Sequence, residues 1–127
     1  MKKGSCLCGD VAFEVEGEMR EIMACHCTQC RKTSGHFWAA TSAPHDKITL
    51  REDRGLKWFR SSEWAQRGFC QSCGSSVFWK MDDREDMSIA AGSLDDATGL
   101  KTKKHICMAT KGEYYEIADG LPQEEKW

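Results

Sequence analysis

The sequence predicts a mainly β fold: a small, zinc-clipped antiparallel β-sheet assembly with little helix. Three observations support this prediction. Apolar and polar residues alternate over several short stretches, which is the period expected of strands with one buried face. Turn-forming residues separate these stretches, for example at 52–55 and 82–86. Cysteines occur in closely spaced groups, a pattern typical of a bound metal that joins distant parts of a chain.

Strands are expected where the alternation is clearest. In the first of them Val11, Phe13 and Val15 share one face, while alanine and glutamate occupy the other. Further strands are expected at residues 47–51, 56–59, 77–79 and 87–91. One short helix is expected to start with Thr28 as its N-cap and to stop at Gly35.

Length and composition indicate a single domain over residues 1–127, with a modest hydrophobic core. Hydrophobic residues make up 40% of the chain and charged residues 30%, as in soluble globular proteins. No stretch approaches the ~18–20 consecutive apolar residues of a membrane helix. The first residues include two lysines but no apolar run, so no signal peptide is expected. We therefore expect a cytoplasmic protein with no membrane partner.

The eight cysteines indicate a reducing compartment, where closely spaced cysteines hold metals more often than they form disulfides. The formal net charge is −2 with neutral thiols. Two divalent cations add four positive charges and seven thiolates add seven negative ones, so the metal-loaded chain would carry −5. A protein this acidic is a poor candidate for binding nucleic-acid phosphates.

Two cysteine pairs can form one complete zinc site. Cys6 and Cys8 are two residues apart, so on an extended strand their side chains point the same way. Cys70 and Cys73 have the spacing of a metal-binding turn, and Gly74 after them suits a backbone with positive φ. Together they would supply four thiolates across 61 intervening residues. The binding energy of such a structural site would contribute to folding.

Three more cysteines, Cys25, Cys27 and Cys30, lie within six residues. Zinc prefers four tetrahedral ligands, so three thiolates leave one position for water or substrate, as in a catalytic site. A closed site, with a fourth ligand from the chain, is the alternative. The candidates for this ligand are Cys107, His105, His36 and His26. Cys107 is the strongest of them because it would give two complete sets of four thiolates. A redox-active group of three thiols is a third, weaker interpretation.

Five segments together resemble the glutathione-dependent formaldehyde-activating enzyme family, which includes centromere protein V. They are GSCLCGDVAFEVEG, ACHCTQCRKTSGHFW, RGFCQSCGSSVFW, AAGSLDD and KKHICMATKGEYYEIADGLPQ, and they span residues 4–123. The resemblance implies a β-tent fold with two zinc ions. It assigns Cys6, Cys8, Cys70 and Cys73 to a structural site, and Cys25, Cys27 and Cys30 to a catalytic-type site. The fourth position of the second site would then belong to a small molecule.

The resemblance also implies carbon–sulfur lyase activity of the S-hydroxymethylglutathione synthase type, in which glutathione condenses reversibly with formaldehyde. The metal would keep the substrate thiol as a thiolate, which attacks the aldehyde carbon. Arg31, Lys32 or the lysines at 101–104 are candidates to bind the carboxylates of glutathione, and Trp38 is a candidate to wall the pocket. The candidates to contact the substrate carbonyl are His105, His26, Arg31 and Ser34. The structural alternatives are a solvated surface for the lysine and a core position for the tryptophan.

Cys107 departs from the family pattern, which usually has an apolar residue after His-Ile. An isolated cysteine is often a small buried hydrophobe, so this residue has two interpretations, as packing or as a fourth metal ligand. The alternative function for the whole chain is a non-catalytic zinc module that binds a partner or nucleic acid. The acidic charge and the absence of a basic stripe with spaced aromatic residues argue against nucleic acid.

Overall fold

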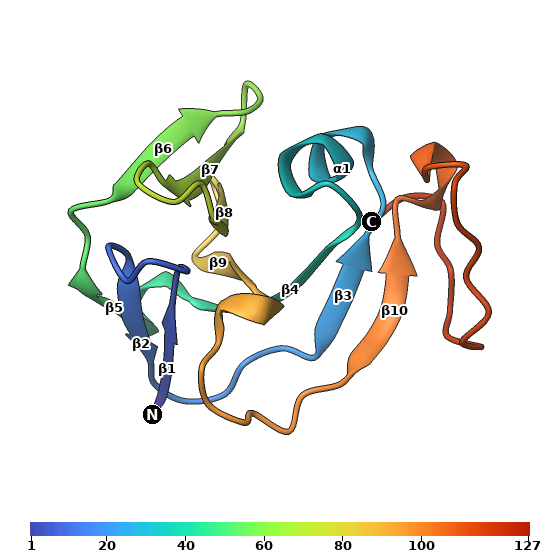
Figure 1. The fold of residues 1–127 in the computed structure, drawn as a ribbon. Helices are drawn as coiled ribbons and strands as arrows, with labels where there is room; N and C mark the ends of the chain where they lie inside the picture. Colours follow the sequence, from blue (N-terminus) through green and yellow to red (C-terminus); the bar gives the residue numbers. More distant parts are fainter.

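The structure is a computed structural model that describes residues 1–127 (Figure 1). Its strands are β1 (Lys2–Ser5), β2 (Ala12–Val15), β3 (Ile22–Cys25), β4 (Trp38–Pro44), β5 (Ile48–Glu52), β6 (Leu56–Arg60), β7 (Ala65–Cys70), β8 (Ser76–Met81), β9 (Asp86–Ala90) and β10 (Thr102–Ile106). Its helices are α1 (Thr28–Ser34) and the 3₁₀ turns η1 (His45–Lys47), η2 (Ala91–Ser93) and η3 (Met108–Thr110). None of these helices has the length and apolar character needed to cross a membrane.

The strands form two sheets. One has three strands in the order β1-β2-β5, and the other has seven in the order β10-β3-β4-β9-β8-β7-β6. The mainly β prediction is confirmed, and the antiparallel prediction holds for every strand pair except one. Strands β10 and β3 run parallel. Parallel neighbours need a long connection, and here most of the chain separates the two strands.

The main hydrophobic core lies where the two sheets meet. The aromatic rings of Phe13 on β2 and Phe78 on β8 pack edge to face there, with centroids 5.1 Å apart. The core consists of Cys6, Val11, Phe13, Val15, Ala43, Cys70, Val77, Phe78, Met87 and Ile89. The predicted inward face of the first strand is therefore confirmed. Because two cysteines belong to this core, one candidate metal site is built into the packing of the sheets.

Helix α1 is present, but Thr28 is not its N-cap as predicted. Cys27 takes that position, and its Sγ accepts a hydrogen bond from the backbone N–H of Cys30 at 3.3 Å. The side chain that caps the helix is therefore a thiol rather than the usual hydroxyl. The end of the helix is as predicted: Gly35 has φ = 87°, and its N–H donates to the Arg31 carbonyl at 2.9 Å.

We expect Gly35→Ala to lower the free energy of unfolding by about 1–2 kcal/mol, because a Cβ in the left-handed region strains the backbone. Chemical denaturation of the metal-loaded protein measures this change. Gly92→Ala is the matched control, since its Cβ would meet no atom within 4 Å and its φ is not positive. Equal stability of the two variants would contradict the role of Gly35 as a cap.

Candidate metal centres

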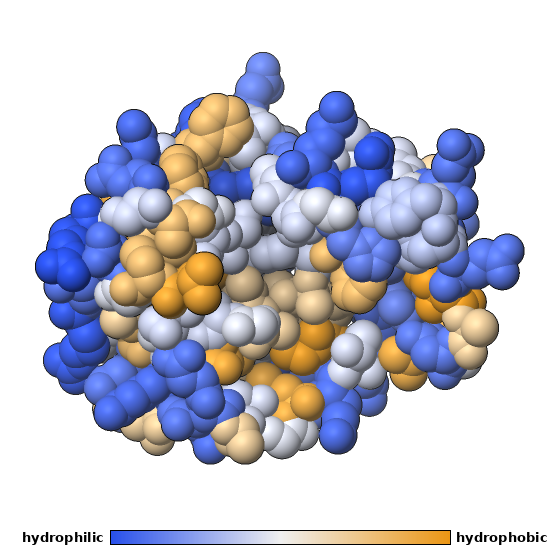
Figure 2. All heavy atoms as spheres, viewed as in Figure 1, coloured by the Kyte–Doolittle hydropathy of each residue, from blue (hydrophilic) through white to orange (hydrophobic).

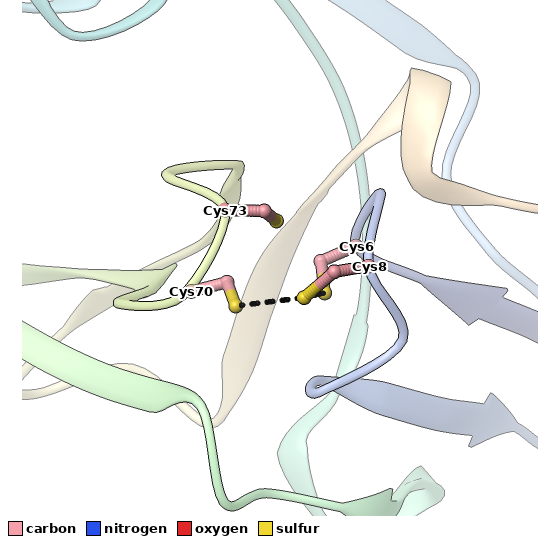
Figure 3. Close-up of side chains that lie close together, drawn as sticks. All are labelled: Cys6, Cys8, Cys70 and Cys73. Carbon is pink, nitrogen blue, oxygen red and sulfur yellow. Dashed lines mark hydrogen bonds between the residues drawn. The ribbon is translucent and has the colours of Figure 1, made fainter.

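The structure brings Cys6, Cys8, Cys70 and Cys73 together at the junction of the two sheets (Figure 3). All four Sγ atoms lie within 4.8 Å of one another. The Sγ of Cys8 is 3.8 Å from that of Cys6 and 3.7 Å from that of Cys70. Zinc–sulfur bonds of about 2.3 Å in a tetrahedron place the sulfurs about 3.8 Å apart, so the residues fit a closed four-thiolate site.

Backbone groups orient the ligands of this four-cysteine group. The N–H of Val11 donates to the Cys6 Sγ at 3.3 Å, and the N–H of Cys6 donates to the Val11 carbonyl at 2.9 Å. On the other side Gly74 has φ = 82°, and its N–H donates to the Cys70 carbonyl at 2.7 Å. Both loops are therefore closed by their own hydrogen bonds, and their sulfurs are directed toward a common point.

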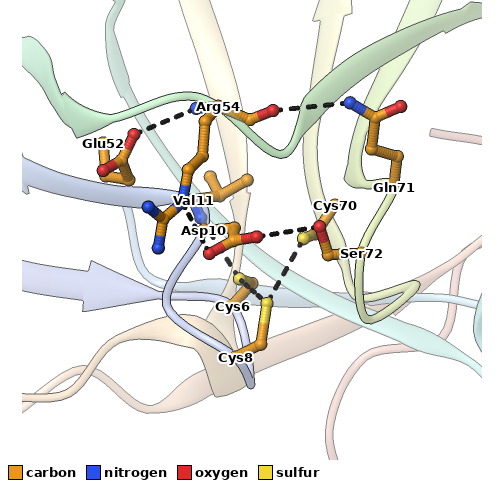
Figure 4. A network of polar contacts seen from close by, with 9 residues as sticks. All are labelled: Cys6, Cys8, Asp10, Val11, Glu52, Arg54, Cys70, Gln71 and Ser72. Atoms are coloured by element: carbon orange, nitrogen blue, oxygen red, sulfur yellow. Dashed lines mark hydrogen bonds and ion pairs between the residues drawn. The ribbon is translucent and has the colours of Figure 1, made fainter.

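A polar network around Asp10 fixes the two ligand loops relative to each other (Figure 4). The carboxylate of Asp10 accepts hydrogen bonds at 2.8 Å from Arg54 Nε and at 2.8 Å from Ser72 Oγ. These two bonds lower the pKa of the Asp10 carboxyl, so that it is ionised at neutral pH. Asp10 therefore ties the loop of Cys6 and Cys8 to the turn of Cys70 and Cys73.

The second group consists of Cys25, Cys27 and Cys30, whose Sγ atoms also lie within 4.8 Å of one another. Cys25 is the last residue of β3, Cys27 caps α1, and Cys30 lies in the first turn of that helix. No histidine, aspartate, glutamate or further cysteine belongs to the group. The donors fit three of the four ligands of a zinc ion, and the fourth position has no ligand from this group.

The three thiols influence one another strongly. Hydrogen bonds from Cys25 and Cys30 lower the pKa of the Cys27 thiol, while contact with Cys27 raises the pKa of Cys25. Contacts with Cys25 and Cys27, together with burial, raise the pKa of Cys30. Without a cation the group therefore keeps protons that a metal must displace, and metal binding is expected to depend on pH.

Arg67 places a buried positive charge against the three-cysteine group. This residue of β7 is only 6% exposed. Its Nη2 donates to the Cys30 Sγ at 3.3 Å, its Nε donates to the Gln29 side-chain oxygen at 2.7 Å, and its guanidinium lies 5.6 Å from the centroid of the Trp38 ring. Buried charges are normally paired, and the partners of this one are the Cys30 sulfur and the Gln29 side-chain oxygen, so a thiolate at Cys30 would be stabilised.

The side chain of His26 turns away from the metal ligands on either side of it. Its Nδ1 bonds to the Tyr115 hydroxyl, and its Nε2 lies 2.9 Å from Nδ1 of His105. The other nitrogen of His105 is 2.7 Å from a carboxylate oxygen of Asp119. Both rings are buried, and burial lowers the pKa of His26 to about 4. His105, expected to contact substrate, therefore has both ring nitrogens engaged within the protein.

A cavity of about 710 Å³ lies between the end of α1 and the loops of the four-cysteine group. Trp38, Ser34 and Thr33 line one side, and Cys6 and Ser75 line the other. Figure 2 shows one face of the molecule, on which hydrophilic residues surround a recessed middle. The residues in this middle are of intermediate or apolar hydropathy. Trp38 packs against Cys30 in a small apolar cluster with Ala40 and Ala90, so it has both a core position and a place in the wall of the cavity.

The two predicted basic residues of α1 have different environments. Lys32 is exposed. Arg31 is half-buried, and its Nε is fully buried with no hydrogen-bond partner. Of the lysines at 101–104, Lys104 pairs with Glu124 at 3.1 Å. Among the predicted basic residues, Arg31 therefore has a buried N–H group that no acceptor in the protein pairs with.

Comparison with known proteins agrees with this geometry. The sequence pattern of the family described as "Glutathione-dependent formaldehyde-activating enzyme" matches residues 1–110. The chain belongs to this family. A protein of Schizosaccharomyces pombe, named as an uncharacterized lyase, is 24% identical over 118 residues, which cover 92% of this chain and 85% of the relative.

The fold of this family member also resembles a crystal structure of a Rhodobacter sphaeroides protein. The two are 24% identical, with a TM-score of 0.61, and the match covers 76% of this chain and 90% of the other. At this identity the likeness concerns the fold alone. The resemblance stated from the sequence motifs is therefore confirmed at the level of family and fold.

Sequence analysis of this family member did not single out Arg67, Tyr115 or Asp119. Arg67 carried one usable signal, because it is a charged residue within the short strand that leads to Cys70, and a charge on a buried strand needs a partner. Tyr115 and Asp119 lie in irregular chain, and no local pattern indicates that they reach the histidines.

Proposed function

We propose that the protein is a zinc-dependent lyase-type enzyme that forms or breaks the adduct of a thiol with an aldehyde at Cys25, Cys27 and Cys30. Family membership favours glutathione as the thiol and formaldehyde as the aldehyde, a reaction of the S-hydroxymethylglutathione synthase type. The observation that carries the proposal is a group of three close thiols in which the fourth position of a tetrahedral zinc ion is not filled by another member of the group. We expect the protein to work in the cytoplasm, where free thiols stay reduced.

The bound metal would supply the positive charge that keeps a substrate thiol ionised at neutral pH. The chain supplies rigid ligands, because Cys25 is fixed on β3 and the other two thiols on the first turn of α1. Arg67 offsets part of the negative charge that four thiolates would bring to the site. His105 would act through His26, by holding the segment between Cys25 and Cys27 in place.

Three further residues would hold the thiol substrate. Arg31 directly follows the ligand Cys30, and its unpartnered buried Nε can donate to a carboxylate or carbonyl oxygen. Lys32 is exposed on the same helix and can meet a second carboxylate. Trp38 would form an apolar wall of the cavity that lies beside the site.

The test is the exchange of ¹³C-formaldehyde between its free form and its glutathione adduct, followed by NMR exchange spectroscopy. We expect the zinc-loaded protein to raise the exchange rate above the rate without protein. Cys30→Ser should abolish the increase and the binding of glutathione, because it removes one of three ligands, while circular dichroism stays unchanged.

Thr49→Ala is the control, since Thr49 is exposed on β5 and belongs to neither a cysteine group nor the wall of the cavity. Its exchange rate should equal that of the wild type. Thiols add to formaldehyde without a catalyst, so the rate without protein is the essential baseline. Full glutathione binding by Cys30→Ser, or a wild-type rate no higher than this baseline, would refute the proposal and favour a non-catalytic zinc module.

A further inference from the structure

Cys107, the one cysteine outside both groups, lies beside the three-cysteine group. It directly follows β10, whose parallel pairing with β3 places Ile106 opposite Cys25. The N–H of His26 donates to the Ile106 carbonyl at 3.0 Å. The chain thus leaves β10 next to the segment that carries Cys25 and Cys27, and the Cys107 thiol lies near the sulfur of Cys25.

The thiol of Cys107 is half-buried and lies near all three members of the group.

The backbone of Cys107 is held in an unusual conformation. It is the only non-glycine residue with positive φ, at φ = 58° and ψ = 41°, a region that residues with a Cβ seldom adopt. The N–H of Cys107 donates to the Lys126 carbonyl at 3.2 Å, and the N–H of Met108 donates to the Glu124 carbonyl at 3.0 Å. The last residues of the sequence thus hold the backbone that carries the thiol.

We propose that Cys107 is an exchangeable fourth ligand, which closes the three-cysteine metal site until a substrate thiol replaces it. The inference rests on the proposed function and adds a resting state to it. The Cys107 sulfur is not among those within 4.8 Å of one another, so its side chain must turn to reach the metal. It is therefore a more weakly held ligand than the three fixed by β3 and α1.

The proposed ligand exchange conserves protons and charge without another reactant. The substrate thiol loses its proton and becomes a ligand, and Cys107 leaves the metal and takes that proton. The site would hold four thiolates before and after the exchange, so the total charge that Arg67 faces would not change. The closed state also lowers the affinity for substrate, because only the open fraction can bind it.

Cobalt-loaded protein tests the proposal, because the intensity of thiolate-to-cobalt charge transfer follows the number of cobalt–sulfur bonds. With both sites filled, we expect eight bonds in the resting wild type and seven in Cys107→Ser. Glutathione should leave the wild-type intensity nearly unchanged, since one thiolate replaces another. In Cys107→Ser it should raise the intensity by about one-seventh, as the seven ligands gain an eighth.

Glutathione affinity, measured by equilibrium dialysis, is the second readout. If the resting site is open a tenth of the time, Cys107→Ser should bind glutathione about tenfold more tightly than the wild type. Cys107→Ala should behave like Cys107→Ser. Thr110→Ser, an exposed change in the adjoining turn, should behave like the wild type.

The outcomes separate this inference from the proposed function. A resting wild type with seven bonds, and with the same glutathione affinity as Cys107→Ser, would overturn the role of Cys107 and leave the proposed function intact. Absence of glutathione binding in every variant would refute the proposed function. The resting wild-type spectrum would still decide whether Cys107 is a ligand, and this measurement does not depend on any variant folding.

Discussion

Cys70→Ser is expected to unfold the protein. Cys70 is fully buried in the main core and belongs to the four-cysteine group that joins both sheets. Structural zinc sites contribute about 10–16 kcal/mol of apparent binding free energy, which is as large as the whole stability of a typical domain, about 5–15 kcal/mol. Loss of one of four ligands should therefore remove the cooperative thermal transition near physiological temperature.

Metal analysis and thermal unfolding by circular dichroism measure this effect together. We expect Cys70→Ser to retain at most one metal ion and to lose its native spectrum, and a strong zinc chelator should do the same to the wild type. Ser72→Ala is the matched control, because it lies in the same turn but contributes only a hydrogen bond to Asp10. A native-like melting curve for Cys70→Ser would show that the fold does not depend on this metal site.

Arg67→Met is expected to weaken metal binding at the three-cysteine group by about 10–100-fold, the usual effect of removing a group that supports a metal ligand. The substitution removes the donor to Cys30 and leaves the charge of the thiolates without its buried partner. Competition with a chromophoric chelator measures the affinity of this group, which should be the first to release its metal. The four-cysteine group contains no such arginine contact and should keep its affinity.

Arg67→Lys separates the charge from the shape of the side chain. Lysine keeps the positive charge but cannot donate to Gln29 and Cys30 from one planar fork. We therefore expect Arg67→Lys to recover part of the affinity lost in Arg67→Met. Equal affinity in the wild type and Arg67→Met would mean that the guanidinium serves packing against Trp38 alone.

The two cysteine groups lie in different parts of the structure. The four-cysteine group lies in the core between the sheets, with closed loops and a fixed polar surround. The three-cysteine group lies at the end of β3 and the start of α1, against a smaller apolar cluster. In the proposed function, a ligand would therefore be exchanged at the second group without disturbing the packing that holds the sheets together.

Local patterns in the sequence predicted five of the ten strands (β2, β5, β6, β8 and β9), the end of the helix and the cysteines that lie close together within each segment. Alternation predicted the buried face of Val11, Phe13 and Val15 because side-chain direction in a strand repeats every two residues. Glycine predicted the end of α1 because Gly35 must adopt a positive φ. Cysteine spacing predicted which thiols of one segment lie together, because residues two or three apart cannot separate far, but the structure shows that Cys6 and Cys8 meet Cys70 and Cys73.

Only the tertiary structure determined which residues from distant parts of the sequence lie against the cysteine groups. It placed β10 parallel to β3, which brings Cys107 to Cys25, and it placed Arg67 against Cys30. These neighbours depend on which strand edges pair and on how the sheet curves, and neither is encoded in local spacing. A periodic pattern specifies which side of a strand is buried, but only the packing of the whole chain specifies which residue lies opposite.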